Sequence, residues 1–544
     1  MSKLIIKKGT VVDPLNEIEG ETKDILIEDG KIVEKFSNES DIKEIDASGK
    51  TVIPAAVDTH TNVASQQVNW ARLLGSANQQ FRETWGDFSL STISRDYIAN
   101  GYTFILETNV FPSFAKQTHL NFQYLPVLDK AISLNVSNLW ALESEYQKNH
   151  YKQAAVFLGD LVKRTKSYGL SSINPFEAEE WNLKNLREDI KQEGRLYNFL
   201  GIDVYETLIE ANEQLGLPNS VQAHIEGYEA SNAKNNLKIL LDKVESLELD
   251  FSEQAERSHI VQIMDAPSLN TGENNEEFIQ AINGSNRINI DLSVIGFDEI
   301  NPLITSDRRL YNKYNETQEV IQSGMEMEGD LFVTLRKFDK QEALFSTLWA
   351  NAIDLALNIE DKWKVQLSYS FPNYSHPNKA PEIATWLLSP KARKKFIDKL
   401  NPEGILDSVK KSDDRLSFTE YVIITRAGPA QSIGLGDMKG NLGIGADGDL
   451  NILDLNVTEI DFSSDYDKVK SAFENIECVV KSGEIVKQGK TIDLSTNGKI
   501  FWSERTAGES KSIMSKKRKF YAKFGANFYD QLSTKVPDEL LRKI

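Results

Sequence analysis

The side chains that could hold a metal or move a proton are few in this chain. Its 544 residues include six histidines and one cysteine. His60 follows an apolar run in the stretch TVIPAAVDTHTN, and Asn62 stands two positions further on. Imidazole is a common zinc ligand, whereas a neutral amide oxygen is a much poorer one. The first question is therefore whether His60 can still take part in a metal site.

The other five histidines lie in different sequence contexts. His224 ends the strand-like run NSVQAH, where it is either a metal ligand or a hydrogen-bonded core histidine. His119, in QTHLN, is either a pocket residue or a polar group on a loop. We expect His150 on a solvated helix and His376, which precedes a proline, in a loop. His259 opens the apolar run HIVQIM.

Composition excludes several classes of protein. A formal charge of −19 and a pI of about 5.0 argue against a nucleic-acid-binding surface. No apolar run approaches the roughly 20 residues that span a membrane, and the amino terminus lacks a secretory signal, so we expect a cytosolic protein. Cys478, in an apolar run, is expected to be a small buried residue. The basic stretch SKSIMSKKRKFYAKF is either a solvated tail or a docking segment for an acidic partner or polyanionic ligand.

The middle of the chain alternates short apolar runs with helix-like stretches. The stretch 332–357, FVTLRKFDKQEALFSTLWANAIDLAL, is predicted to be helical. About eight such βα units form a TIM-type (β/α)8 barrel, in which function resides at the carboxyl ends of the strands. The runs predicted to be strands are 103–108, 220–224, 259–264, 288–294 and 365–370.

Both ends of the chain instead alternate apolar and polar residues. Asp29-Gly30 and Ser482-Gly483 lie between such runs, which is a β-hairpin signal. We expect residues 1–53 and 411–495 to form one small composite β-sandwich domain. The barrel would then occupy residues 54–410, and residues 496–544 would be a carboxyl-terminal extension.

Several stretches resemble the amidohydrolase superfamily. DASGKTVIPAAVDTHT is similar to the strand that enters the barrel of these proteins, and ITRAGPAQSIGL with KGNLGIGADGDLNILDL is similar to the return to the small β domain. Within the superfamily, the chain resembles the A subunits of formylmethanofuran dehydrogenase and of the formyltransferase/hydrolase complex. The matching stretches include VNWARL, GYTFILET, SYGLSSINPFEAEEW, ANEQLGLPNSVQAH and PEIATWLLS.

This resemblance implies a defined set of metal ligands. In the family, two divalent metals supply a hydroxide that attacks a formamide carbonyl, and an acidic residue moves the proton. The ligands are a His-x-His pair on the first strand, a carboxylated lysine on the fourth, histidines on the fifth and sixth, and an aspartate on the eighth. His60 and His224 occupy the first and fifth positions. The positions of the remaining ligands are occupied by Asn62, by Ser171 or Ser172, by Met264 and by Ser370.

These replacements predict a degenerate site. Serine cannot carry a carbamate, and Ser370 cannot replace an acidic proton shuttle. His259 lies five residues before Met264 and could compensate only along a different backbone path. We therefore assign no catalytic residue, expect no cofactor, and allow at most one weakly held zinc on His60 and His224. Candidates for substrate binding are Arg72, His119 and Asn373.

Two functions follow from the resemblance. The first is a catalytically degenerate protein that assembles with the other subunits of a formyltransferase/hydrolase-type complex and meets a furan-type one-carbon carrier. The second is an active metal-dependent hydrolase that releases formate from an N-formyl carrier. A cyclic amidase resembling hydantoinase or dihydroorotase would need the same metals, so the replaced metal ligands argue against it as well.

Overall fold

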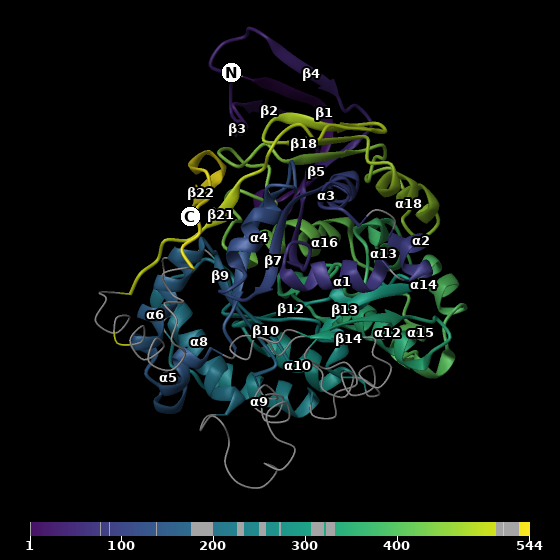
Figure 1. Ribbon diagram of the computed structural model, residues 1–544. Helices are drawn as coiled ribbons and strands as arrows, with labels where there is room; N and C mark the ends of the chain where they lie inside the picture. Colours follow the sequence, from purple (N-terminus) through teal and green to yellow (C-terminus); the bar gives the residue numbers. More distant parts are fainter. Residues whose placement is uncertain are drawn as a thin grey trace.

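The computed structural model places a barrel beneath a β-sheet that both halves of the chain build (Figure 1). None of the described helices combines the length and the apolar character that a membrane span requires. The structure describes residues 2–76, 78–85, 88–137, 139–175, 200–225, 233–249, 257–270, 274–305, 320–322, 332–507, 515 and 532–544.

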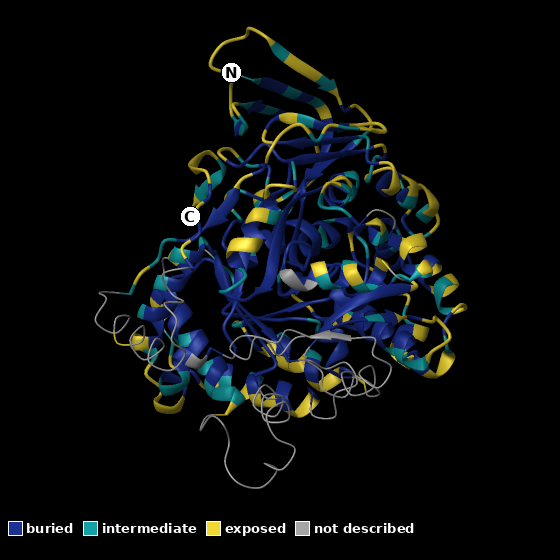
Figure 2. Ribbon diagram, in the orientation of Figure 1, coloured by how far each residue is buried: buried dark blue, intermediate teal, exposed yellow. Residues whose placement is uncertain are grey.

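The barrel is a (β/α)8 barrel of parallel strands, as predicted. Neighbouring strands pair in chain order, and the last returns to the first through a bridge between Thr61 and Phe371. The strands are buried and helices cover them (Figure 2), which is why they are rich in apolar residues. The strands are β6 (Ala56–Thr61), β7 (Tyr102–Val110), β8 (Asp129–Asn135), β9 (Gly169–Ile173), β10 (Val221–His224), β11 (Val261–Ile263), β12 (Ile288–Asp291) and β16 (Val365–Gln366).

Most helices around the barrel bury one apolar face, whereas the helix over Ala343–Asn358 is buried on nearly all sides. In α6, for example, the buried residues recur with the spacing of a helix that has one face against the core. The helices are α1 (Gln66–Ser76), α2 (Gln79–Trp85), α3 (Leu90–Ala99), α4 (Ala115–Phe122), α5 (Glu143–Lys148), α6 (Tyr151–Thr165), α8 (Gly201–Leu215), α9 (Ala233–Ser246), α10 (Glu276–Gly284), α12 (Ala343–Asn358), α13 (Ala380–Leu388), α14 (Pro390–Ile397), α15 (Asp407–Lys411), α16 (Phe418–Val422), α17 (Gly428–Ser432) and α18 (Tyr466–Glu474).

A second sheet combines both ends of the chain. It contains nine strands, and β17 from the carboxyl-terminal part pairs antiparallel with β5 from the amino-terminal part. The two predicted hairpins are present: Asp29-Gly30 and Ser482-Gly483 all have positive φ, as a two-residue turn of this type requires. Cys478 is buried, as expected. The strands are β1 (Lys3–Asp13), β2 (Ile18–Glu28), β3 (Lys31–Val33), β4 (Ile42–Asp46), β5 (Thr51–Pro54), β17 (Leu450–Leu453), β18 (Cys478–Lys481), β19 (Glu484–Gln488) and β20 (Thr491–Ile492).

A third, three-stranded antiparallel sheet was not predicted. It comprises β13 (Ile300–Thr305), β14 (Val320–Gln322) and β15 (Phe332–Lys337). The prediction of one helix over 332–357 is therefore wrong in its first part, and α12 begins only at Ala343. In FVTLRK the buried positions pair with β13 residue by residue, and this tertiary pairing overrides the helical pattern.

Several predicted barrel strands are shorter than expected, and the run 259–264 is a strand only over Val261–Ile263. The run 288–294 is a strand only to Asp291, after which Ser293–Ile295 form a helical turn. The run 365–370 is a strand only to Gln366, and Ser370 has a positive φ of 42°. After Asp291 and after Gln366 the chain stops pairing with its neighbouring strand, at the carboxyl end of the barrel.

The carboxyl-terminal segment adds to the barrel sheet. β21 (Ile500–Trp502) pairs with β8, and β22 (Leu541–Lys543) pairs with β21, both in parallel. Apart from Ser515, the basic stretch that we singled out lies outside the described residues. The division into three domains stays a prediction.

A buried ion network connects the barrel, the nine-stranded sheet and β22. The Lys439 amino group lies 2.5 Å from an Asp129 carboxylate oxygen, 2.8 Å from Asp447 and 2.6 Å from Asp449. Lys481 reaches Asp129 at 2.9 Å, and Arg542 of β22 reaches Asp447 at 2.6 Å. Burial raises the pKa of Asp129, but Lys439 and Lys481 more than offset this and hold it at about 2.

We expect Lys439→Met to lower the free energy of unfolding by about 3–5 kcal/mol, because it leaves three buried carboxylates without their central cation. Chemical denaturation measures this change. The matched control is Lys470→Met, which removes an exposed pair with Glu474 and should cost less than about 1 kcal/mol. Equal effects of the two substitutions would contradict the role assigned to Lys439.

Candidate functional site

The candidate site is a cleft at the carboxyl end of the barrel strands. Its empty volume is about 400 Å³, part of which is open to solvent. Ile304 of β13 forms part of its wall, so the third sheet covers one side of the barrel mouth. The cleft is lined by His60, Asn62, Asn109, Ile173, His224, Asp265, Leu303, Ile304, Thr305, Asn373 and Tyr374.

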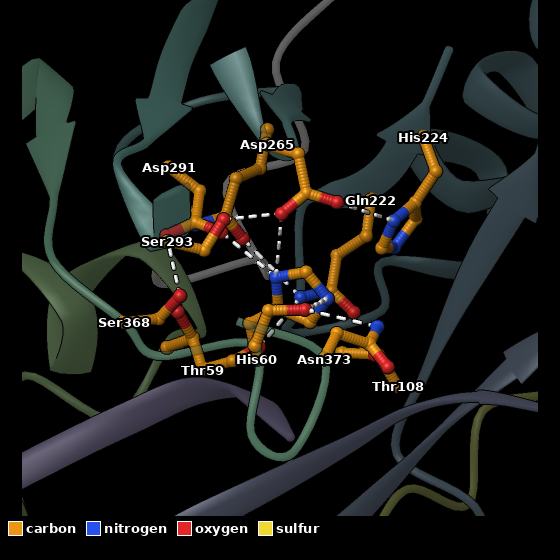
Figure 3. Close-up of polar contacts among 12 residues, drawn as sticks. Thr59, His60, Thr108, Gln222, His224, Asp265, Asp291, Ser293, Ser368 and Asn373 are labelled. Carbon is orange, nitrogen blue, oxygen red and sulfur yellow. Dashed lines mark hydrogen bonds and ion pairs between the residues drawn. The ribbon is translucent and has the colours of Figure 1, made fainter. Parts of the chain in front are cut away.

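His60 is hydrogen bonded at both ring nitrogens (Figure 3). Its Nδ1 lies 2.8 Å from Asp291 Oδ2, and its Nε2 lies 3.0 Å from Ser370 Oγ. An ionised carboxylate can only accept, so Nδ1 carries a proton and, in the neutral ring, Nε2 accepts from the Ser370 hydroxyl. Asp291 in turn accepts from Ser368 Oγ at 2.6 Å.

His224 and Asp265 form the opposite side of the cleft. Asn109 Nδ2 lies 3.1 Å from His224 Nε2, and His224 Nδ1 lies 3.9 Å from Asp265 Oδ2. Asp265 Oδ1 lies 3.7 Å from His60 Nδ1 and accepts from Ser293. The two imidazole rings meet edge to face, with 5.0 Å between their centres.

The carboxylates set the protonation of this site. Burial lowers the pKa of His60, but Asp265, Asp291 and Asp58 more than offset it, so the pKa is raised overall. Burial lowers the pKa of His224. Burial raises the pKa of Asp265, but His60 and His224 reverse this and lower it. The carboxylates around His60 therefore favour its protonated form.

Asp265 and Asp291 were not predicted from the sequence. Ligands were sought only at the positions implied by the resemblance, and one of these positions carries Met264. Asp265 follows β11 with a positive φ of 51°, which turns the chain after Met264, and Asp291 is the last residue of β12. A carboxylate at the carboxyl end of a barrel strand is itself a functional signal, and it could have identified both residues.

The other predicted site residues lie in different places. Asn62 and Asn373 line the cleft with His60 and His224. Ser370 contacts His60, and Asn373 Nδ2 donates to Ser370 Oγ at 3.3 Å. Ser171 is fully buried on β9, and its Oγ has no hydrogen-bond partner among the described residues.

Arg72 and His119 are not among the residues that line this cleft. Arg72 donates to Phe88 O at 2.8 Å, and His119, buried on α4, contacts Thr165 O at 2.8 Å. Their role in substrate binding stays a prediction. His119 lies on a helix rather than a loop, and burial lowers its pKa to about 4.

The remaining histidines lie outside the cleft lining. His259 precedes β11 at its amino end, where Ser258 Oγ lies 2.7 Å from its Nδ1, so it does not reach the position of Met264. His150 is exposed at the start of α6. His376 lies in a loop, as expected, with its Nε2 3.0 Å from Asp96.

A two-metal centre does not fit these residues. Among the described residues, His60, His224 and Asp265 offer donor atoms within 4.8 Å of one another, and so do Asp129, Asp447 and Asp449. The second group surrounds the Lys439 amino group. In the first group, both nitrogens of His60 are hydrogen bonded to other residues, and a structural or catalytic zinc usually takes three or four protein ligands. These donors could hold at most one ion.

Glu107 of β7 fixes the loop that follows β6. Its buried carboxylate accepts from the backbone N–H groups of Val63, Ala64 and Ser65 at 2.7–2.9 Å and from Thr61 Oγ1 at 3.1 Å. Burial raises the pKa of Glu107 to about 7, although these hydrogen bonds act to lower it. The loop begins at Asn62, so Glu107 positions one wall of the cleft.

Comparison with known proteins identifies the family of this chain. The model of the amidohydrolase family matches residues 43–487, and the chain belongs to this family.

Two curated relatives are similar over nearly the whole chain. The protein FwdA of Methanocaldococcus jannaschii is 28% identical, with 95% of each chain covered. The A component of the formyltransferase/hydrolase complex Fhc of Methylorubrum extorquens is 25% identical, with 90% of each chain covered. The crystal structure of that complex (FhcABCD) with methylofuran contains a chain that matches with a TM-score of 0.85 at 22% identity, covering 100% of this chain and 99% of that one. This structural match confirms the fold.

We expect Glu107→Gln to lower the free energy of unfolding by about 2–5 kcal/mol, because the amide nitrogen replaces one acceptor and leaves buried N–H groups unsatisfied. Thermal and chemical denaturation test this. The control, Glu34→Gln, alters an exposed carboxylate and should change stability by less than about 0.5 kcal/mol. A loss no larger than the control's would show that Glu107 does not hold the loop.

Proposed function

We propose that this chain is the A-type component of a formyltransferase/hydrolase-like complex of one-carbon metabolism, working in the cytosol. The observation that carries the proposal is similarity to FwdA and to the A component of Fhc over at least 90% of the chain. The partners would be the other subunits of such a complex. The ligand would be a furan-type formyl carrier, in keeping with the methylofuran bound in the related complex.

The proposed site for the carrier's formyl end is the cleft around His60. Amide groups of Asn62, Asn109 and Asn373 are present in its wall, and each can donate to a carbonyl oxygen or accept from an N–H group. Apolar residues of β9 and β13, Ile173 and Ile304, complete it. The lining is mostly polar, so hydrogen bonds rather than apolar burial would orient the ligand.

We further propose that the family's two-metal hydrolysis is lost. Of the ligand positions implied by the resemblance, His60 and His224 are retained, and the others carry Asn62, Ser171, Met264 and Ser370. An active metal-dependent hydrolase is the alternative function. An active hydrolase would need metal ligands beyond those in the cleft. The metal content of the purified protein therefore distinguishes the degenerate protein from the active hydrolase.

Affinity purification of the full-length chain from its own cells tests the assembly. We expect sister subunits of the formyltransferase/hydrolase type to co-purify, and methylofuran to bind saturably by calorimetry. Asn62→Phe should abolish methylofuran binding by filling the cleft, whereas the exposed control Asn475→Phe should not. A chain that purifies without such subunits and binds no carrier contradicts the proposal.

Elemental analysis of the chelator-free protein should find far less than one zinc per chain, because the cleft gathers too few ligands for a stable site. Removal of metal with a chelator should leave the melting temperature unchanged. Close to two metals per chain would reinstate the metal-dependent hydrolase. A partial occupancy that His224→Ala removes would identify one weakly held ion at His60 and His224.

A further inference from the structure

Asp265 is an accessible carboxylate in the wall of the cleft. Its side chain is 21% exposed, whereas those of His60 and His224 are 1% and 5% exposed. No lysine or arginine is among the described residues that line the cleft. We propose that Asp265 and Asn109 bind the ammonium group of a small primary amine, and that the cleft therefore takes the carrier in its deformylated, amine form in preference to its N-formyl form.

The Asp265 carboxylate has hydrogen-bonding capacity to spare. Figure 3 shows it between the rings of His60 and His224. Its Oδ1 accepts from Ser293 Oγ. The ring nitrogens nearest to it, Nδ1 of His60 and Nδ1 of His224, lie 3.7 and 3.9 Å away, beyond hydrogen-bonding distance. A carboxylate can accept about four hydrogen bonds, so Oδ2 can accept from a ligand.

Asn109 supplies a second acceptor beside the same imidazole. It lines the cleft, it is 5% exposed, and its Oδ1 has no hydrogen-bond partner among the described residues. Its Nδ2 lies 3.1 Å from His224 Nε2 and 3.2 Å from Thr108 Oγ1, so the amide nitrogen is engaged and the amide oxygen is not. A buried acceptor without a donor is destabilising. An N–H group of a ligand in the cleft would remove this penalty.

The hydrogen bonds direct the imidazole protons away from a close pair with Asp265. His60 donates from Nδ1 to Asp291 at 2.8 Å. Asn109 Nδ2 donates to His224 Nε2, so this nitrogen carries no proton. Among the described residues, Asp265 therefore has no cation in hydrogen-bonding contact. A positively charged ligand group would supply the partner that this carboxylate lacks.

The backbone holds Asp265 at a fixed place in the wall. Its φ of 51° lies in the left-handed region, which aspartate tolerates better than most residues. Met264 N donates to Ala223 O of β10 at 3.0 Å. Ser268 donates to Asp265 O through its N–H at 2.9 Å and through its Oγ at 2.8 Å. The turn that carries the carboxylate is thus bonded on both sides, so the acceptor is in place before a ligand arrives.

An ammonium group complements these acceptors, and a formamide does not. A primary alkylamine is protonated at neutral pH, as the lysine side chain is, and its three N–H donors suit Asp265 Oδ2 and Asn109 Oδ1. N-formylation converts the nitrogen into a neutral amide with one N–H, so Asp265 loses its counter-charge. A site built to pair one ligand rejects the analogue that leaves its polar groups unpaired.

The rest of the lining suits a small neutral stem. Ile173, Leu303 and Ile304 line the cleft together with the polar residues, and a furan ring can pack against such side chains. Removal of a formyl group is the reaction that supplies the preferred ligand. The choice of carrier rests on the proposed function, whereas the preference for an amine rests on Asp265 and Asn109.

Calorimetry on the full-length, chelator-treated chain tests this preference with three probes of similar shape: furfurylamine, N-furfurylformamide and furfuryl alcohol. Physiological salt screens the overall negative charge of the chain. We expect furfurylamine to bind at least about 10-fold more tightly than either neutral probe, as a hydrogen bond to a charged group allows. Asp265→Asn should lower the affinity for furfurylamine by about 10- to 100-fold and leave that for furfuryl alcohol unchanged.

The matched control is Asp437→Asn, which alters an exposed carboxylate outside the cleft lining and should keep the parental preference. The comparison of probes on the parental chain does not depend on any variant. No binding of furfurylamine, equal binding of all three probes, or a preference that survives Asp265→Asn would overturn the assignment. Methylofuran binding without a preference for the amine would refute this inference alone, and amine preference without methylofuran binding would refute the proposed carrier alone.

Discussion

The ammonium group of Lys439 is the point at which the separate parts of this chain are joined. It lies among carboxylates from barrel strand β8 and from the segment that leads into β17, and Arg542 of the last strand completes the arrangement. A buried ion is costly unless every charge has a partner. The amino-terminal sheet, the barrel and the carboxyl-terminal strand can therefore bury these groups only together. The network lies among residues near the amino ends of the strands, and it leaves their carboxyl ends for the cleft.

Closure of the barrel is what creates the site. His60 lies on the first strand and Ser370 follows the last, so 310 positions of sequence separate two residues that hydrogen bond. The bond from Asn62 N to Phe371 O closes the sheet at this point, and Glu107 holds the adjoining loop from the second strand. At the other end, α17 approaches the barrel, where Ser432 accepts from Asn289 of β12 at 3.0 Å. The geometry around His60 thus depends on contacts from several strands.

Much of this architecture could be predicted from the sequence, because it rests on local patterns. The two hairpin turns follow from Asp-Gly and Ser-Gly pairs, and the strand that contains His60 was marked by its apolar run. The third sheet could not be predicted, since FVTLRK becomes a strand only through pairing with β13. The contacts of Ser370 were beyond the sequence for a similar reason: a pattern shows that an aspartate is missing from the eighth strand, but not that a serine there faces an imidazole.

The proposed loss of metal ligands agrees with the charges around His60. A two-metal site gathers anions because the metal ions compensate them. Without metals, a carbamate at Ser171 and an aspartate at Ser370 would add uncompensated negative charge beside Asp265 and Asp291. In this chain both positions are neutral, and the two remaining carboxylates face His60 and His224, which can carry positive charge. The pKa of His60 is raised because the nearby carboxylates outweigh the effect of burial. These contacts support the proposal that the charges of the site balance without metal ions, with His60 between the two carboxylates.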